Sequence, residues 1–550
     1  MVRPYFADGQ PHLLLLLDAL RFDVAARLSG IDKGIYLALR SQIEIPMKIR
    51  FTSSVSAATL LLLMGATAAQ AQPAPIMKMT TDIPPGIAIP DKVETRLGTL
   101  EFFDGFPDKA TVDKVYDNLD FQRAVQAYLL ALAPVNMAGL REGLLGVGPA
   151  NVTIPTFENN LNARSIFLTA NATTPYTWIW INLHDGPLVV EVPPMTLGMI
   201  DDFWFKYVTD IGIVGPDKGQ GGKYLLLPPG YKGEVPEGYT VVRVPTFESI
   251  LVWRNMPVKG DIKPAIERLH KNTRIYALSQ SANPPSNTFV DVSNRDFSTV
   301  APADDRFWEL LNYVVQNEPV ESLDPVTLGF FASIGIEKGK AFAPDDRMKK
   351  ILTEAAAVGD ATARTLTYQS RIPEAFYYPN STWRQWLGGY KFQSQPGVAH
   401  LDAAAFFYFY ATGVTPAMEA KMVGQGSQYA VGIVDSRGNP LDGSKTYRLR
   451  VLPNAPVKDF WSAIVYDNQT RSMLQTDQDF PQVSSLDKGL VVNKDGSVDV
   501  YFGPKAPAGM EHNWIQTIPG KGWNMLFRLY GPLEPWFDKT WKLSEIVLVN

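Results

Sequence analysis

The residues best suited to chemistry lie near the carboxyl end of the sequence, where ionisable and aromatic side chains alternate. Glu511 and His512 come first, Trp514 follows, and Arg528 and Tyr530 end the run. Carboxylate, imidazole and guanidinium groups beside aromatic faces suit a polar organic molecule or a glycan, which they bind by hydrogen bonds and stacking. The cluster predicts a ligand site, although tryptophan and tyrosine in strands also commonly fill a core.

Asp467 supplies a second carboxylate, because it follows a predicted strand and enters a loop, where functional side chains concentrate. Two carboxyl groups suffice for acid–base work when burial raises the pKa of one of them. We therefore expect Glu511 and Asp467 to be catalytic and to converge with Trp514 and Arg528 on one partly open cleft. The structural alternative is that Arg528 forms an ion pair with Asp467 or Asp499.

Three more residues complete the predicted ligand-binding set. Arg471 lies in the loop after the predicted strand 460–466, where it binds a ligand or forms an ion pair that holds the turn. Trp178 and Trp180 share one face of the predicted strand 178–183, and two isoleucines share the other. Two apolar faces predict burial on both sides, with a helix, a ligand or a partner covering the second face.

Metal and thiol chemistry find little support in the sequence. It has no cysteine and five histidines, which are scattered and form no HExxH motif, so we expect no metal and no cofactor. Residues 493–499 carry oxygen ligands at alternate positions, as a calcium loop would, but flanking strands favour a hairpin. The net charge of −5 and the lack of a polybasic run argue against nucleic acid as a partner.

Residues 47–71 have the three parts of a cleavable signal peptide: a basic start, a short apolar stretch and a small-residue exit. The apolar stretch is roughly a dozen residues, shorter than the roughly 20 needed to cross a membrane. We therefore expect a periplasmic or secreted protein without membrane insertion. Residues 1–46 then represent a start site assigned too far upstream, or alternatively a genuine amphipathic presequence.

Hydrophobic periodicity divides the rest of the chain into alternating β and helical blocks. Apolar spacing predicts a helix from Thr111 that ends at Pro134. The Asp-Gly pair within residues 184–187 predicts a hairpin between two strands. The predicted divisions are a mis-assigned extension (1–46), a signal peptide (47–71), a leader and helical segment (72–150), an amino-terminal β-sandwich domain (151–300), a helical linker segment (301–428) and a carboxyl-terminal jelly-roll-like domain (429–550).

Two long segments carry a resemblance to known families. Residues 169–193 and 221–239 resemble the domain-of-unknown-function family numbered 1254, which is an amino-terminal domain. Residues 460–474, 495–523 and 528–541 resemble its usual companion, the family numbered 1214. The resemblance implies a mainly β, multidomain protein with two antiparallel β-sandwich or jelly-roll domains joined by helices. It implies no reaction and transfers no catalytic residues.

Two classes of function remain open at this point. The first is an exported, metal-independent hydrolase or lyase that acts on a polar organic or glycan-like substrate. The second is a non-catalytic envelope protein that binds a glycan or small ligand, or a structural homo-oligomer. Two carboxylates facing each other across one pocket would favour catalysis, whereas an open aromatic strip would favour binding.

Overall fold

The computed structural model describes residues 81, 84–258, 261–385, 391–418 and 421–549. It divides the chain into two compact units, residues 1–87 and 88–550, and the account below concerns the second unit. The predicted upstream extension and signal peptide lie outside the described residues. In the described ranges, no helix combines the length and the apolar character needed to cross a membrane.

The second unit begins with a small antiparallel sheet of β1 (Lys92–Thr95), β2 (Gly98–Phe103) and β3 (Phe106–Pro107), which leads into α3 (Lys109–Leu145). The side chain of Asp108 caps this helix by accepting a hydrogen bond from Thr111 N. The prediction that the helix ends at Pro134 is wrong. Proline removes one helical hydrogen bond, but Pro134 and its neighbours are buried, and this packing keeps the helix continuous.

The first β region contains a six-stranded and a four-stranded sheet. Their strand orders are β14-β4-β6-β12-β8-β9 and β11-β10-β7-β13. The strands are β4 (Thr153–Thr156), β6 (Tyr176–Asn182), β7 (Leu188–Val192), β8 (Thr196–Asp202), β9 (Tyr207–Gly212), β10 (Gly222–Leu227), β11 (Thr240–Arg243), β12 (Glu248–Asn255), β13 (Arg274–Ala277) and β14 (Thr288–Asp291); β5 (Ser165–Ile166) pairs with β15 (Phe297–Ser298), and α4 spans Lys263–Asn272.

The hairpin predicted at residues 184–187 is wrong, because β6 and β7 belong to different sheets. A turn does form there, and Gly186 adopts a φ of +116°. A turn signal fixes a local change of direction but does not fix which strand the chain pairs with next. Here the chain leaves one sheet and enters the other.

The prediction that β6 is buried on both faces is confirmed. Ile179 and Ile181 join an apolar cluster that includes residues of both sheets of this region. Trp178 and Trp180 join a second cluster, which also contains residues of α3 and of the helical segment. Helices therefore cover much of the tryptophan face, as expected.

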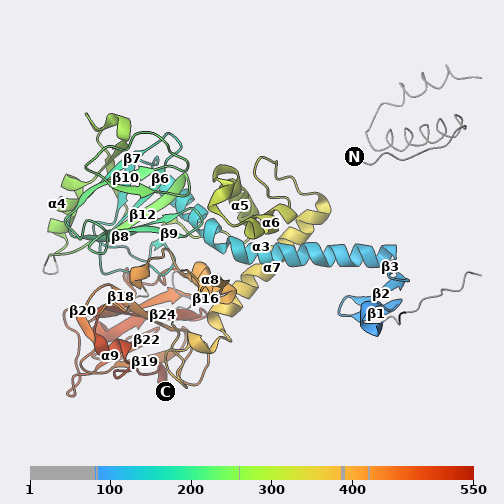
Figure 1. Cartoon of the computed structure of the whole chain (residues 1–550). Helices are drawn as coiled ribbons and strands as arrows, with labels where there is room; N and C mark the ends of the chain where they lie inside the picture. Colours follow the sequence, from blue (N-terminus) through green and yellow to red (C-terminus); the bar gives the residue numbers. More distant parts are fainter. Residues whose placement is uncertain (1–80, 82–83, 259–260, 386–390, 419–420, 550) are drawn as a thin grey trace, which may run out of the picture. The chain divides into compact units, whose positions relative to one another are not determined.

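The helical segment consists of α5 (Arg306–Asn317), α6 (Pro325–Ser333), α7 (Asp346–Tyr368) and α8 (Leu401–Tyr410), with a short pair of strands, β16 (Gln393–Gln395) and β17 (Val398–Ala399). Helices α5, α6 and α7 pack along α3 (Figure 1). The side chain of Asp345 caps α7 by accepting a hydrogen bond from Met348 N.

The second β region also contains two sheets, with strand orders β18-β24-β20-β21 and β23-β22-β19-β25. Residues of both sheets share one apolar cluster. The elements are β18 (Ser427–Gly432), β19 (Thr446–Val451), β20 (Val457–Asp467), β21 (Gln482–Ser484), β22 (Val498–Gly503), η6 (Glu511–Asn513), β23 (Trp514–Gln516), β24 (Trp523–Pro532), α9 (Glu534–Phe537) and β25 (Val547–Val549).

The fold is thus mainly β, with several sheets and intervening helices, as predicted. The expectation of wholly antiparallel sheets is wrong at their edges. The pairs β10–β11, β14–β4 and β22–β23 are parallel. A parallel neighbour needs a crossover connection, which the spacing of predicted strands does not reveal.

Candidate functional site

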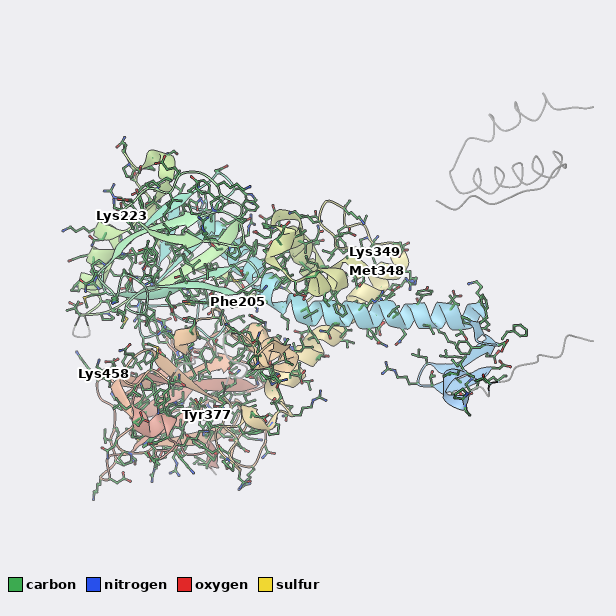
Figure 2. All side chains as sticks on the ribbon, in the orientation of Figure 1. Phe205, Lys223, Met348, Lys349, Tyr377 and Lys458 are labelled. Carbon is green, nitrogen blue, oxygen red and sulfur yellow. The ribbon has the colours of Figure 1, made fainter. Side chains whose placement is uncertain are left out.

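A pocket lies where strands β6, β8 and β12 of the first β region meet β18 and β24 of the second. The segment after α8, residues 411–418, forms one side. The empty space measures about 780 Å³ when the part open to solvent is included. Phe205, which is labelled in Figure 2, packs against Phe407 and Tyr408 of α8, with ring centres 6.4 and 5.1 Å away.

Alternation along β24 places Arg528 at this pocket. Met525, Phe527 and Leu529 point into the core of the second β region. Leu526 belongs instead to the cluster shared with the first region, and Arg528 lies on that same face. This division into a core face and a mixed face follows from the alternation of residues 524–530 alone.

Arg528 is a buried cation whose partners are all uncharged. Its side chain is 3% exposed, and its Nη2 donates to the hydroxyl of Tyr466 at 2.9 Å and to the carbonyl oxygen of Thr169. Its Nε has no hydrogen-bond partner among the described residues. Burial lowers the pKa of Arg528, but the surrounding tyrosines outweigh it and raise the pKa above its usual value, so the group stays charged.

Thr169 holds its carbonyl toward Arg528 from an unusual backbone conformation. Its φ is +42°, in a region that β-branched residues rarely adopt. The conformation is fixed by two hydrogen bonds, from Thr169 N to the carbonyl of Arg471 at 2.9 Å and from Thr169 Oγ1 to the carbonyl of Tyr410 at 2.9 Å. Backbone strain of this kind concentrates at functional sites.

Arg254, near the end of β12, brings a second guanidinium to the pocket. Its Nη1 donates to Ser427 Oγ at 3.3 Å, and its guanidinium carbon lies 5.7 Å from the ring centres of both Tyr176 and Tyr530. Burial lowers the pKa of Arg254, as it does for Arg528, but nearby tyrosines raise it by more, so the pKa lies above its usual value. Among the described residues, neither arginine forms an ion pair with a carboxylate.

Tyr429 of β18 lies between the two cations. It is 6% exposed and lines the pocket, and the guanidinium of Arg528 sits 5.2 Å from its ring centre. Burial raises the pKa of Tyr429. The charges of Arg254 and Arg528, together with hydrogen bonds from Arg254 and Ser427, lower it by more. The pKa of Tyr429 therefore lies below the ordinary value for a tyrosine.

The rest of the lining is mostly apolar. Leu197, Met199 and Val252 come from β8 and β12, and Met418 lies opposite them on the segment after α8. One acid, Asp210, also lines the pocket, but its Oδ1 accepts a 2.6 Å hydrogen bond from Thr415 Oγ1, and burial raises its pKa. The pocket thus combines two cations with an apolar wall.

Comparison with known families identifies both β regions. The family DUF1254, described as a protein of unknown function, matches residues 152–277, and the family DUF1214, described in the same words, matches residues 426–534. The chain carries a DUF1254 region followed by a DUF1214 region. This order confirms the resemblance found in the sequence.

Two solved structures are similar to this chain. The crystal structure of the VPA0106 protein from Vibrio parahaemolyticus is 21% identical with a TM-score of 0.49, and the match covers 78% of this chain and 100% of that one. The crystal structure of a putative uncharacterized protein from Burkholderia cenocepacia is 12% identical with a TM-score of 0.36, covering 79% and 96%. No curated protein matches the sequence.

The pocket draws on both family regions. DUF1254 supplies Trp178 and Arg254, while DUF1214 supplies Ser427, Tyr429 and Arg528. A site of this kind needs both regions to be complete.

The structure does not bring together the residues predicted to form one cleft. Glu511 is exposed on η6, where it accepts a hydrogen bond from Gly509 N, and backbone hydrogen bonds lower its pKa. Asp467 is buried and forms an ion pair with Lys521. Among the described residues no hydrogen bond or ion pair joins Glu511, Asp467 and Arg528. Glu511 lies next to β23, in the sheet β23-β22-β19-β25, whereas Arg528 belongs to the other sheet of the second β region and faces the DUF1254 region.

The other predicted site residues are divided between the pocket and structural roles. Trp178 lines the pocket with Arg528, and Tyr530 lies close to Arg254. His512 is exposed, and Trp514 donates its indole N–H to the carbonyl of Gly503 at 2.9 Å.

Trp180 and Arg471 contribute to the structure away from the pocket lining. Trp180 donates its indole N–H to Glu248. Arg471 donates to the carbonyls of Phe409 at 3.2 Å and Gln469 at 2.8 Å, and its guanidinium lies 4.0 Å from the Phe409 ring centre. Together with its bond to Thr169, this makes Arg471 a link between the two regions.

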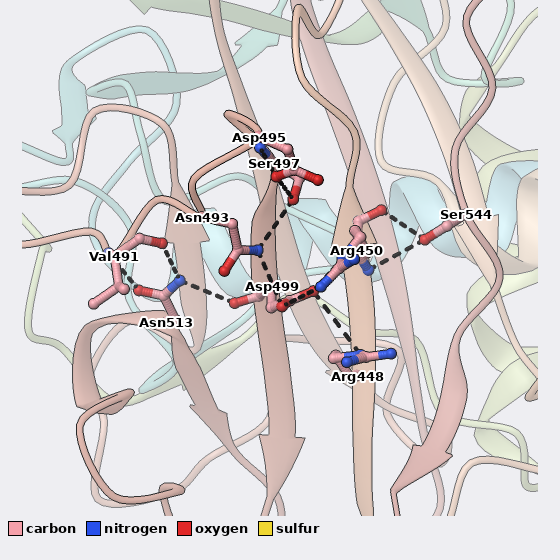
Figure 3. Close-up of polar contacts among 9 residues, drawn as sticks. All are labelled: Arg448, Arg450, Val491, Asn493, Asp495, Ser497, Asp499, Asn513 and Ser544. Carbon is pink, nitrogen blue, oxygen red and sulfur yellow. Dashed lines mark hydrogen bonds and ion pairs between the residues drawn. The ribbon is translucent and has the colours of Figure 1, made fainter.

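The alternative structural prediction for Arg528 is also wrong. Asp499 pairs instead with Arg450, through contacts of 2.8 and 2.9 Å, and with Asn493 (Figure 3). The predicted strand preceding residue 494 does not form, although Asn493 N bonds to the carbonyl of Ser497 across a turn at Gly496. In the described part of the chain, no group of three or more metal-ligating side chains occurs.

The sequence reasoning missed Arg254, Ser427 and Tyr429. A signal for Arg254 was present, because it follows Ile250 and Val252 on one apolar face of a strand, where a cation is out of place. No comparable signal marks Ser427 or Tyr429. Their role depends on which strand of the other region they meet.

Proposed function

We propose that this chain binds a small organic anion, a carboxylate, in the pocket between the DUF1254 and DUF1214 regions. The observation that carries the proposal is the presence of two guanidiniums, Arg254 and Arg528, that have no carboxylate partner in the described chain. A buried charge without a counter-charge costs several kcal/mol. A bound anion would supply that counter-charge.

The apolar wall favours an organic ligand over an inorganic ion. Leu197, Met199, Val252 and Met418 would contact the body of the ligand, while the guanidinium groups hold its carboxylate. A ligand with both features would gain from burial of apolar surface as well as from charge pairing.

The test compares binding of 3-phenylpropionate and propionate to the wild type and to Arg528→Met, by calorimetry. Arg528→Met should weaken 3-phenylpropionate binding about 100-fold, because a charge pair in a water-poor pocket is worth several kcal/mol. Arg450→Met is the matched control, since Arg450 pairs with Asp499 outside the pocket, and it should leave affinity unchanged. Failure of the wild type to bind either acid, or equal binding by Arg528→Met, would refute the proposal.

A reaction at this site is a second candidate, favoured by Tyr429. In its phenolate form, which Arg254 and Arg528 favour by lowering the pKa, Tyr429 can take the proton from the carbon next to the carboxylate of a bound acid and become neutral, which is the first step of a lyase reaction. This moves the proposed hydrolase or lyase chemistry from Glu511 and Asp467 to the pocket. Nuclear magnetic resonance of acids incubated in deuterium oxide should show deuterium exchange next to the carboxylate with the wild type and none with Tyr429→Phe.

We also propose that the protein acts outside the cytoplasm, in the periplasm or as a secreted protein. The support is the signal-peptide pattern of residues 47–71. Amino-terminal sequencing of protein made in its own host should begin near Gln72. A mature protein that retains Met47 would contradict this assignment.

For the fold, we propose that each β region is a sandwich, the second of jelly-roll type. The support is that strands of two sheets share one apolar cluster in each region. An experimental structure should then show the paired sheets stacked about 10 Å apart. Sheets that meet edge to edge would rule the proposal out.

A further inference from the structure

Two residues that line the pocket each carry a buried N–H donor that finds no acceptor in the described chain. One is Nε of Arg528, and the other is the indole Nε1 of Trp178. The two residues are 3% and 2% exposed, so bulk water does not satisfy either donor. Leaving a buried donor unpaired costs about 1–3 kcal/mol.

Other indoles nearby do have partners. Trp180, two residues along the same strand, donates to Glu248. Trp253 on the adjacent strand donates to Asn255 Oδ1 at 3.0 Å, and Trp204 donates to Ser322 Oγ at 2.7 Å. The unpaired indole of this strand is therefore the one that lines the pocket.

One more indole, that of Trp523, is also buried without a partner, but it packs in the core of the DUF1214 region and does not line the pocket. Trp178 differs because it lies next to the two cations. Tyr176 and Arg254 form a cross-strand pair, and Trp178 pairs with Val252 one step along the same face. The indole of Trp178 and the guanidinium of Arg254 thus belong to one continuous surface.

The indole of Trp178 is held in place by its neighbours. Its ring centre lies 5.2 Å from that of Phe167 and 5.5 Å from that of Tyr176. A ring packed in this way keeps one orientation, so its N–H is a preorganised donor. A neutral donor recognises an oxygen acceptor and does not require a second charge.

We propose that the ligand is an organic acid that also carries an uncharged oxygen acceptor, such as a keto or hydroxyl group, which accepts a hydrogen bond from Trp178. This inference rests on the proposed function, since it assumes that the two arginines hold the carboxylate. Trp178 then determines specificity, because an acid without the second oxygen leaves the indole unpaired. A site built to bond an oxygen rejects the analogue that lacks it.

The experiment uses two acids that differ only in that oxygen. Phenylpyruvate carries a keto group where 3-phenylpropionate carries a methylene. The wild type should bind phenylpyruvate about 10-fold more tightly, which corresponds to one buried hydrogen bond of about 1.4 kcal/mol. In Trp178→Phe the two affinities should agree within about 2-fold, because the donor is gone and the aromatic ring remains.

Trp180→Phe is the matched control, since it removes an indole from the same strand and the same face but outside the pocket. It should keep the full preference for phenylpyruvate. Equal affinities in the wild type, or a preference that persists in Trp178→Phe, would overturn the inference while leaving the anion site intact. Failure of the wild type to bind either acid would refute the proposed function itself.

A second measurement does not depend on the folding of a variant. In wild-type protein labelled with ¹⁵N-tryptophan, phenylpyruvate should move one indole N–H resonance downfield, as a new hydrogen bond does. The same concentration of 3-phenylpropionate should leave that resonance in place. A spectrum in which both acids cause the same shift, or neither causes one, would contradict the inference.

Discussion

The chain places arginines in two contrasting settings. In the network of Figure 3, Arg450 forms a two-bond contact with Asp499, whose side chain is 9% exposed, while Arg450 itself is 41% exposed. In the pocket, Arg254 and Arg528 contact hydroxyl groups, a carbonyl and aromatic rings, and neither contacts a carboxylate of the described residues.

The difference shows what each arrangement contributes. Asp499 has charged partners within the chain, Arg450 at 2.8 Å and Arg448 at 3.9 Å, so this network stabilises the sheet. In the pocket, the buried guanidinium of Arg528 and the partly buried one of Arg254 have no carboxylate partner in the described chain, and the unpaired charge of Arg528 lowers stability unless an anion binds. A buried cation that destabilises the protein without a ligand indicates a role in ligand binding.

The largest expected effect comes from giving the pocket a carboxylate of its own. Ser427 Oγ already contacts Arg254, so Ser427→Asp would place an acid within reach of the cation. We expect 3-phenylpropionate affinity to fall about 100-fold, because the internal carboxylate competes with the ligand.

Ser427→Asn is the control for that change, since it has nearly the same shape without the charge. Its affinity should stay close to that of the wild type in the same calorimetric titration. If Ser427→Asp bound the acid normally, the pocket cations would not be the ligand-binding groups.

A smaller effect, about 10-fold, should follow from pH. The pKa of Tyr429 lies below its ordinary value, so the phenolate forms at a lower pH than for a free tyrosine. Once formed, the phenolate offsets one of the two positive charges of Arg254 and Arg528 and weakens anion binding, so affinity for 3-phenylpropionate should fall as pH rises, by at most about 10-fold per pH unit. Tyr429→Phe should remove this dependence; an affinity that rises with pH in the wild type would be the opposite result.

The smallest effect belongs to the structural network. Asp499→Asn should lower the free energy of unfolding by about 1–2 kcal/mol, because charge-assisted hydrogen bonds from Arg450 are lost and solvent screens part of the pair. Affinity for 3-phenylpropionate should not change. Thermal unfolding monitored by circular dichroism measures the first effect and calorimetry the second.

The pH dependence of that loss has a defined sign. Hydrogen bonds from Arg450 lower the pKa of Asp499 in the folded state, against the opposing effect of burial. A lowered carboxyl pKa stabilises the fold above the unfolded value of about 3.9, and this contribution is lost as pH falls through the folded value. The difference between wild type and Asp499→Asn should therefore be full at neutral pH and shrink in acid.

The sequence predicts features that depend on a single strand. Alternation in β24 separated Arg528 from the core residues Met525 and Phe527, and the two apolar faces of β6 were confirmed. Neither conclusion required knowledge of which strands pair.

Features that depend on distant contacts were beyond the sequence. The turn at Gly186 was found, but its pairing was not, and the continuity of α3 through Pro134 depends on packing by other helices. The predicted convergence of Glu511 and Asp467 depended on distant contacts in the same way. The sequence does not show how the loops that carry these two residues are placed relative to each other. One partner of Arg528, the carbonyl of Thr169, lies in the other family region, more than 350 positions away.

The central claim is tested most directly by locating a heavy anion in crystals of the mature protein. Bromide at moderate concentration, detected by its anomalous scattering, should occupy a position in contact with both Arg254 and Arg528. No bromide should appear beside Arg450, where Asp499 already supplies the negative charge. Bromide at Arg450 with none in the pocket, or a carboxylate of the protein seated between the two pocket arginines, would contradict the account.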